Sequence, residues 1–561
     1  MALAVTPDTN PLETLRSVTV APRVIDGFRP LAQSLEWGLS DLYWSTQGLS
    51  GFVSNEVPYL VNNSGSLSAS AAEVLYANCV EAPGSGAIRV LELGSGSGLF
   101  ARYLLDEFQR LCQSRGADFF DRLQYYVSDR SRHTVEQWSE RELFARDAGR
   151  AIPCICDALD PAAAQTLDGQ AIALSGLRAI FANYVLDSLP AAILRKGENG
   201  PEQLCVRTHL TGDQQRIRQY TTLDLDALRA LAASPDPVER AQLIPLMPLF
   251  EFEPQFQPCL PLADWANQAL NFGQNLDRIL VNYGACQCIE RCLALLETSG
   301  FVLINDYGAI QFDQIAGRAS SQRFGSSTAV GLNFPLIEHH LTAQRIDVIR
   351  PDGDEHLPVH PRLIPKPGLG QTRQAFLVAF DGNQRRINDA PVERARKHIE
   401  AGRMDQAKEE YEAALRLRPR DWHLIGEVAE FVIRQLAAYE AGLQLARSAI
   451  ALNPWHAVWL WNVLGDVLFV LDRFTEAHEA YLYAQKMEPG DVRTCLNLGY
   501  TYAQAGRYQE ALQALATGLA NDRNALFRER LIEKQQHILA QISARFQSEQ
   551  EWLARRAARL R

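Results

Sequence analysis

The chain has 561 residues, of which 47% are hydrophobic and 22% charged, a composition typical of soluble globular proteins with two to four domains. A formal net charge of −11 argues against a general nucleic-acid binder. The sequence contains neither a long apolar run nor an apolar segment behind a basic start, so we expect no membrane span and no secretory signal. Ten cysteines are too few for a disulfide scaffold, and no histidine joins them at zinc-finger spacing. They predict buried thiols, no metal site and a cytoplasmic location.

The first part of the chain is predicted to be irregular and then helical. Residues 1–35 contain four prolines without a lasting period. Apolar residues fall at helical spacing over 30–44, and a second helix is expected from 68 to about 80. The glycine- and asparagine-rich loop between these helices is either a lid or a plain surface connection.

From residue 90 onward, apolar strands alternate with helices. Strands are predicted at 90–93, 123–127, 152–156, 178–182, 301–304 and 374–380, with a helix over 287–296 that Gly300 ends. This alternation predicts an α/β fold with a doubly wound, largely parallel, Rossmann-like sheet. Residues 195–280 interrupt the pattern and are expected to form an inserted subdomain over the substrate. Within it we expect a hairpin of strands at 204–208 and 216–220, and a helix over 222–233 with Thr222 as its N-cap.

The C-terminal part is repetitive. Small residues recur at Ala407, Ala441, Ala477 and Ala511, and prolines at 419, 454 and 489. The period resembles that of tetratricopeptide repeats, which are helix pairs of 34 residues. We therefore expect an all-α repeat domain over 390–523 that binds a protein partner, and a capping helix over 524–561. A polar segment, 382–389, is predicted to be a linker between separately folding halves.

The stretch Glu92-Leu93-Gly94-Ser95-Gly96-Ser97-Gly98 carries the clearest chemical signal. Glycines between a strand and a helix let a ligand approach the backbone closely. The G-x-G-x-G spacing differs from the G-x-G-x-x-G dinucleotide fingerprint and from the phosphate-binding P-loop. It resembles the first motif of class I S-adenosylmethionine-dependent methyltransferases, whose loop wraps the methionine part of the cofactor.

Polar side chains follow the strands, at the sheet edge where such folds bind ligands. Asp129 either accepts hydrogen bonds from ribose hydroxyls or caps a helix, and Asp157 has the same two interpretations with adenine in place of ribose. Asn183 is placed to orient a nitrogen nucleophile. Asp187 is placed to accept a proton or to pair with a cation, unless it caps the next helix.

Three segments together resemble the MidA-type methyltransferases: the glycine motif, residues 183–190, and Leu303-Ile304-Asn305-Asp306-Tyr307-Gly308. Residues 52–58 resemble the N-terminal loop of that family more faintly. The resemblance spans about residues 36–381 and implies S-adenosyl-L-methionine as cofactor and a protein arginine as substrate. Tyr184 stands where the family usually has glutamate, which can hold a guanidinium, so the identity of the acceptor stays open.

The resulting hypothesis is a protein methyltransferase whose repeats recruit the substrate. The alternatives are a small-molecule methyltransferase whose repeats serve assembly, and a scaffold with a decayed methyltransferase domain. The expected site comprises cofactor-binding residues Glu92, Gly94, Ser95, Gly96, Gly98, Asp129, Asp157 and Asn183, and catalytic residues Asn183, Tyr184 and Asp187.

Overall fold

The computed structural model describes residues 23–49, 65–259, 262–324, 327–455, 457–522 and 525–559. The segment 52–58 and most of the predicted loop before residue 65 lie outside these ranges. The chain divides into two compact units. The smaller draws on Met1–Tyr43, Pro190–Tyr283 and Ile315–Ala329, and the larger on Trp44–Leu189, Gly284–Gln314 and Val330–Arg561.

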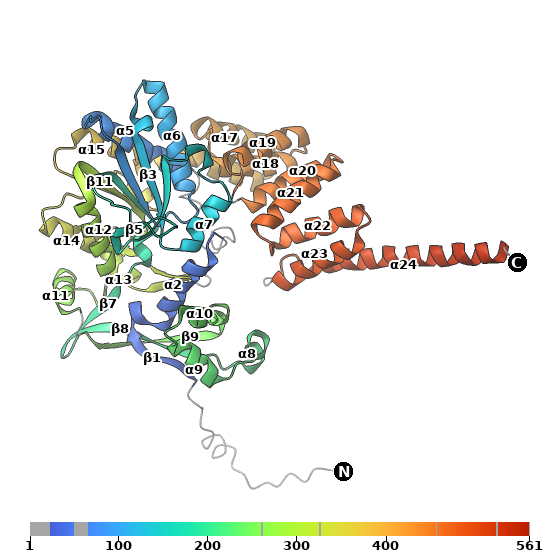
Figure 1. Ribbon diagram of the computed structural model, residues 1–561, viewed down its shortest axis with the longest axis horizontal. Helices are drawn as coiled ribbons and strands as arrows, with labels where there is room; N and C mark the ends of the chain where they lie inside the picture. Colours follow the sequence, from blue (N-terminus) through green and yellow to red (C-terminus); the bar gives the residue numbers. More distant parts are fainter. Residues whose placement is uncertain are drawn as a thin grey trace, which may run out of the picture. The chain divides into compact units, whose positions relative to one another are not determined.

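The larger unit is built on a seven-stranded sheet in the order β16-β11-β6-β2-β3-β4-β5 (Figure 1). Neighbouring strands from β11 to β4 are parallel, and β16 and β5 are antiparallel edge strands. The prediction of a largely parallel, doubly wound sheet is therefore confirmed. The strands are β2 Ile88–Leu93, β3 Leu123–Asp129, β4 Ala151–Asp157, β5 Asp160–Gln165, β6 Leu177–Asn183, β11 Leu296–Asp306 and β16 His360–Pro365.

Helices with apolar faces cover both sides of this sheet. On one side, Phe100 packs edge-on against Phe181 of β6, with ring centroids 5.5 Å apart. On the other side, Ile289 and Ile337 lie against Ile304 of β11. The helices are α5 Ser66–Glu81, α6 Leu99–Arg115, α7 Arg132–Glu140 and α15 Gly370–Ala379 around the first core, and α12 Tyr283–Leu295 and α14 Phe334–Ala343 on the other face.

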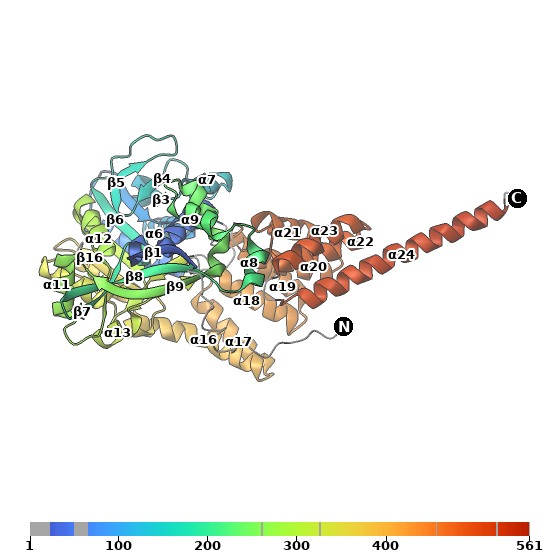
Figure 2. The ribbon, with the colours of Figure 1, turned by 90° about the horizontal axis from the view of Figure 1, so that it is seen from below.

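The smaller unit contains an antiparallel sheet in the order β1-β8-β7-β10, with β9 also paired to β8. Figure 2 shows the long strands β8 and β9 side by side. The inserted subdomain is thus present, and the N-terminal segment joins it, because β1 pairs with β8. The prediction that residues 1–35 are irregular is wrong over β1.

The strands of the smaller unit are β1 Val24–Pro30, β7 Ala192–Gly197, β8 Gly200–Leu210, β9 Phe250–Pro258, β10 Ile279–Val281, β13 Ser321–Phe324 and β14 Ser327–Val330. Its helices include α8 Gln214–Tyr220, α9 Leu225–Ala233, α10 Pro237–Ala241, α11 Ala263–Phe272 and α13 Ile315–Arg318. Helix α2, Leu35–Gln47, follows β1.

Four expected elements differ in kind or in boundary. Segment 216–220, predicted as a strand, lies in α8, because Asp213 caps the helix by accepting the Arg216 amide. Segment 374–380, also predicted as a strand, forms α15, and the edge strand is β16 instead. Helix α9 is capped by Asp224 rather than Thr222. Helix α12 ends at Leu295, before Gly300.

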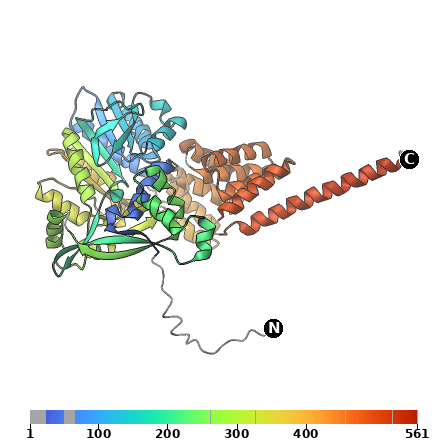
Figure 3. The same ribbon diagram turned by 60° about the horizontal axis from the view of Figure 1, so that its bottom comes forward.

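The repeat region consists of paired helices, as predicted. Each pair turns at a residue with positive φ, namely Gly402, Ala437, Asp472 and Gly506. The recurrent buried small residues are Ala407, Gly442, Ala477 and Ala511, so Gly442 takes the place expected for Ala441, which is exposed. The pairs are α16 Gly382–Glu400 with α17 Met404–Leu417, α18 Trp422–Arg434 with α19 Tyr439–Leu452, α20 Val458–Val470 with α21 Phe474–Met487, and α22 Val492–Gln504 with α23 Tyr508–Asn521. The expected capping helix is α24, Arg528–Arg559, a single unbroken helix (Figure 3).

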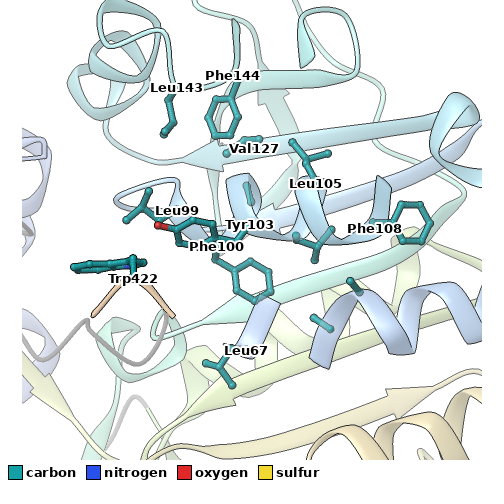
Figure 4. Close-up of a cluster of buried hydrophobic side chains, with 14 of the residues drawn as sticks. Leu67, Leu99, Phe100, Tyr103, Leu105, Phe108, Val127, Leu143, Phe144 and Trp422 are labelled. Atoms are coloured by element: carbon teal, nitrogen blue, oxygen red, sulfur yellow. The ribbon is translucent and has the colours of Figure 1, made fainter. Parts of the chain in front are cut away.

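The predicted linker 382–389 is instead the first part of helix α16. Asp381 caps this helix by accepting the amides of Asn383 and Gln384. The repeats also share a hydrophobic core with the sheet region, since Trp422 of α18 lies in the same cluster as Tyr103 of α6 (Figure 4). The expectation that residues 382–389 are a linker between separately folding halves is therefore wrong.

Candidate active site

The glycine motif forms the turn from β2 into α6 at the carboxyl edge of the parallel strands. Gly94, Gly96 and Gly98 all have positive φ, at 59°, 51° and 74°. A Cβ atom on Gly94 would lie 2.8 Å from Val185 Cγ2, and one on Gly98 would lie 2.6 Å from Leu143 Cδ2. These positions therefore require glycine for backbone conformation, and two of them also for space.

The turn is fastened to β3 and α7 by hydrogen bonds. The Ser95 amide donates to Ser128 O at 2.8 Å, and the Gly96 amide donates to Asp129 Oδ2 at 3.1 Å. The indole of Trp138 donates to Gly96 O at 2.9 Å. The main chain of the turn is thus held in one conformation before any ligand arrives, which lowers the entropic cost of binding.

Asp129 is not the helix N-cap that one interpretation expected. The N-cap of α7 is Ser131, whose hydroxyl accepts the Thr134 amide. Asp129 uses its other oxygen to accept the Ser131 amide at 2.9 Å, and burial raises its pKa. It therefore links the glycine turn to the start of α7, and it remains a candidate for ribose binding.

Glu92 is almost fully buried, and burial raises its pKa to about 8. The Tyr125 hydroxyl donates to Glu92 Oε2 at 3.1 Å and offsets part of this effect. The Ser95 hydroxyl and the Asn183 amide nitrogen face the same carboxyl, yet within the described residues neither makes a hydrogen bond of ordinary geometry. Ser95 and Asn183 thus place two buried polar atoms beside the Glu92 carboxyl.

Asp157 stands apart from this group. Its side chain is exposed and accepts the Leu159 amide at 2.8 Å, within the turn that joins β4 to β5. No helix follows, so the capping interpretation is wrong for Asp157. Its position at the end of β4, next to β3, keeps the adenine interpretation as a hypothesis.

The ends of β6 and β11 form a second polar group. Asn305 Nδ2 donates to Asn183 Oδ1 at 2.7 Å, and the two residues pair across the strands. Tyr184 has φ 51°, and its amide donates to Asn305 O. A non-glycine residue in this conformation is strained, a condition common at functional sites.

Two buried carboxyl groups lie at this point, Asp187 and Asp306. Asp306 Oδ2 accepts the amides of Leu186 and Asp187 at 3.1 and 3.3 Å. Burial raises the pKa of Asp187 to about 7, and burial together with the Asp187 charge raises the pKa of Asp306 well above its ordinary value. The pair therefore holds a proton near neutral pH, and a cation would favour its full ionisation.

Two tyrosines accompany the acid pair. The rings of Tyr184 and Tyr307 lie 6.3 Å apart and are tilted by 40°. The Tyr307 hydroxyl is buried near Asp187, and among the described residues it has no hydrogen-bond partner of ordinary geometry. Sequence reasoning named Asn183, Tyr184 and Asp187, but left Asp306 and Tyr307 out of the site although it quoted their motif. Nothing in the sequence pointed to Tyr125 or Trp138.

The described residues contain no group of three or more metal-ligating side chains and no helix long and apolar enough to cross a membrane. The ten cysteines are free and buried, as predicted.

Comparison with known proteins agrees with this architecture. Residues 72–330 match the family described as "Putative S-adenosyl-L-methionine-dependent methyltransferase". Residues 394–421 and 462–525 match models of tetratricopeptide repeats. These matches confirm the expected methyltransferase family, its cofactor and the repeats.

Two solved structures from Burkholderia thailandensis are similar to the chain. One, an uncharacterized protein, is 14% identical and covers 62% of this chain and 90% of its own, with a TM-score of 0.40. The other, described as a "likely methyl transferase" bound to S-adenosyl-homocysteine, is 15% identical and covers 69% and 88%, with a TM-score of 0.35. Among curated proteins, the peroxisomal targeting signal receptor of Candida albicans is 34% identical over 82 residues, which are 15% of this chain and 14% of that receptor.

Proposed function

We propose that this protein methylates a nitrogen of a basic protein side chain, since residues 72–330 match a family described as putative S-adenosyl-L-methionine-dependent methyltransferases. The observation that carries the proposal is the buried pair Asp187 and Asp306 with Tyr184 and Tyr307 beside it, next to the glycine turn. The cytoplasm is the proposed location, since ten free, buried thiols fit a reducing compartment.

The glycine turn has the features that the cofactor needs. Its three glycines hold the backbone at positive φ, a conformation that side chains disfavour. Ser95 Oγ and Asn183 Nδ2 are buried polar atoms without hydrogen-bond partners of ordinary geometry among the described residues. We assign Gly94, Gly96 and Gly98 to the methionine part, Asp129 to the ribose and Asp157 to the adenine. When bound, S-adenosyl-L-methionine supplies an electrophilic methyl group on sulfur.

The acid pair and the tyrosines suit a positively charged acceptor. Carboxylates hold an ammonium or guanidinium by charge-assisted hydrogen bonds, and aromatic faces attract cations. Asp187 is positioned to take the proton that the nitrogen loses, and Asn183 to orient the nitrogen. Tyr184 brings no charge where the family usually has glutamate, but Asp187 and Asp306 supply it. Arginine and lysine are therefore both candidate acceptors.

The repeats are assigned to substrate recruitment. Tetratricopeptide repeats present a surface to protein partners, and recruitment raises the effective concentration of the acceptor. The competing assignment is assembly, with a small molecule as acceptor.

The test is transfer of labelled methyl groups from S-adenosylmethionine into a lysate of cells that lack this protein. We expect label in protein bands with the native chain and at least about a tenfold lower rate with Asp187→Asn. Asp160→Asn, which changes an exposed acid at the start of β5, is the matched control and should keep the rate. Label confined to small molecules would favour the assembly alternative. No cofactor binding in calorimetric titration would favour the decayed scaffold.

A further inference from the structure

Helix α24 has one face that the repeats cover and another that they leave open. Leu531 and Ile538 are fully buried in a cluster with Leu496, Ala511 and Leu515 of α22 and α23. Ile542 is the last residue of α24 that packs against this cluster. Beyond it, the described side chains through Arg556 are exposed. The C-terminal half of the helix therefore has no cover among the described residues.

The open face carries an apolar stripe with a strict period. Ile532, Leu539, Phe546 and Leu553 follow one another at intervals of seven, and they are 40%, 52%, 64% and 58% exposed. A seven-residue interval is nearly two helical turns, so the four side chains lie in one row, about 32 Å long. This period is the spacing of a helix that pairs with another helix.

The residues three or four positions from the stripe are mostly uncharged along its middle and charged at its ends. The middle is flanked by Gln535, Gln536, Ile542, Ser543, Glu549 and Gln550, and the ends by Arg528, Glu529 and Arg556. Such a narrow seam suits a single partner helix. A helix that lies on a membrane needs a broader apolar face bordered by Lys and Arg, whereas Glu549 also borders this stripe.

We propose that the stripe binds the same helix of a second copy of this chain, in antiparallel orientation. In one register, Ile532 meets Leu553 of the second copy while Leu539 meets Phe546, so each copy completes the other's row. The same register places Glu529 opposite Arg556 at both ends, and both residues are exposed. A parallel pairing would instead set Glu549 against Glu549 and Arg556 against Arg556, which is repulsive.

The first test measures the mass of the full chain by light scattering over a range of concentrations. We expect a dimer that dissociates on dilution. The double substitution Leu539→Asp with Phe546→Asp should raise the dissociation constant at least about tenfold, because it places charges in the central layers. Gln547→Asp, exposed on the same helix but off the stripe, is the control and should leave the dimer unchanged. Circular dichroism verifies that helix content is kept. A native chain that stays monomeric at all concentrations overturns the proposal. A monomeric chain that binds anionic vesicles overturns it as well.

The second test determines orientation. The native cysteines are buried, so introduced ones report on the surface. A mixture of Leu539→Cys and Phe546→Cys chains should form a mixed disulfide faster than either chain alone. Glu529→Arg should weaken the dimer, and adding Arg556→Glu should restore it. Faster cross-linking of Leu539→Cys with itself, or no rescue by the charge exchange, overturns the antiparallel arrangement. None of these readouts depends on methyl transfer.

Discussion

Gly94 combines a backbone and a packing requirement at the start of the cofactor turn. Its φ is 59°, and a Cβ would lie 2.8 Å from Val185 Cγ2. We expect Gly94→Ala to abolish detectable binding of S-adenosylmethionine in calorimetric titration, because both the turn and the segment after β6 must shift.

The control for Gly94 is Gly116→Ala, at the C-cap of α6. Gly116 has a similar φ of 65° but nothing within 4 Å of a Cβ. Both variants should lose about 1–2 kcal/mol of stability to backbone strain. Equal cofactor affinity of the two variants would show that the close packing of Gly94 against Val185 does not affect cofactor binding.

Asp129 has two possible roles, binding of the cofactor and support of the chain at the start of α7, and substitutions can distinguish them. We expect Asp129→Ala to weaken cofactor binding by about 1–3 kcal/mol, the usual loss for a hydrogen bond to a charged group. Ser131→Ala removes the cap of α7 and should cost about 1 kcal/mol of stability with little effect on affinity. If the two substitutions reduce affinity alike, Asp129 acts only through the position of α7.

The pKa of Asp187, raised by burial to about 7, predicts a pH dependence. The rate of methyl transfer should fall about tenfold per pH unit below that value, because the neutral carboxyl neither holds a cation nor takes a proton.

The folded state binds the Asp187 proton more tightly than the unfolded chain does, so the contribution of this group to stability is lost as pH rises from about 4 to about 7. Urea unfolding at pH 5 and pH 8 checks the second effect. Asp187→Asn should shrink the difference in the free energy of unfolding between pH 5 and pH 8. An unchanged difference would contradict the assignment.

Sequence patterns found several residues of the site that end strands, although Asp306 at the end of β11 was left out, and they missed those brought in by tertiary contact. Asp129 and Asn183 end strands that the apolar pattern marks clearly. Trp138 reads only as an apolar residue of a helix, and its hydrogen bond to the glycine turn exists because α7 packs against β3 and β4.

At the scale of elements, the parallel strands were predictable because both faces of each are covered, which gives continuous apolar runs. The same reasoning mistook α15 for a strand. A short apolar run of about seven residues is compatible with either structure, and here the Phe376 ring packs into the core from a helix while Val378 is exposed. Strand β1 was missed because its partner, β8, lies far away in the chain.

Helix α16 gives a prediction at this scale. Asp381 accepts two amides at its start, so Asp381→Ala should lower the free energy of unfolding by about 1 kcal/mol. Arg386→Ala, exposed within the same segment, should change it little. Chemical denaturation measures both. A flexible linker would tolerate both substitutions equally. Equal free energies of unfolding for the two variants would therefore contradict a helical connection.

For the whole molecule, the question is whether the sheet region and the repeats fold as one unit. The Tyr103 hydroxyl of α6 donates to Leu452 O at 3.2 Å, and the Arg141 guanidinium donates to Trp455 O at 3.1 Å. Trp422, 1% exposed, belongs to the core that contains α6. Because α6 starts at the glycine turn, the repeats support the helix on which the cofactor site is built.

We therefore expect Trp422→Ala to lower the free energy of unfolding by about 3–5 kcal/mol and to weaken cofactor binding as α6 loosens. Leu417→Ala, exposed on α17, is the control and should do neither. A fragment of residues 1–385 should be insoluble, or should melt at a lower temperature than the full chain, because it uncovers the face of α6 that the repeats bury. Thermal melts and calorimetric titration of the two chains decide this. A soluble fragment with the full chain's melting temperature and cofactor affinity would mean that the shared core adds no stability. The repeats would then act on the methyltransferase only through the partners they bind.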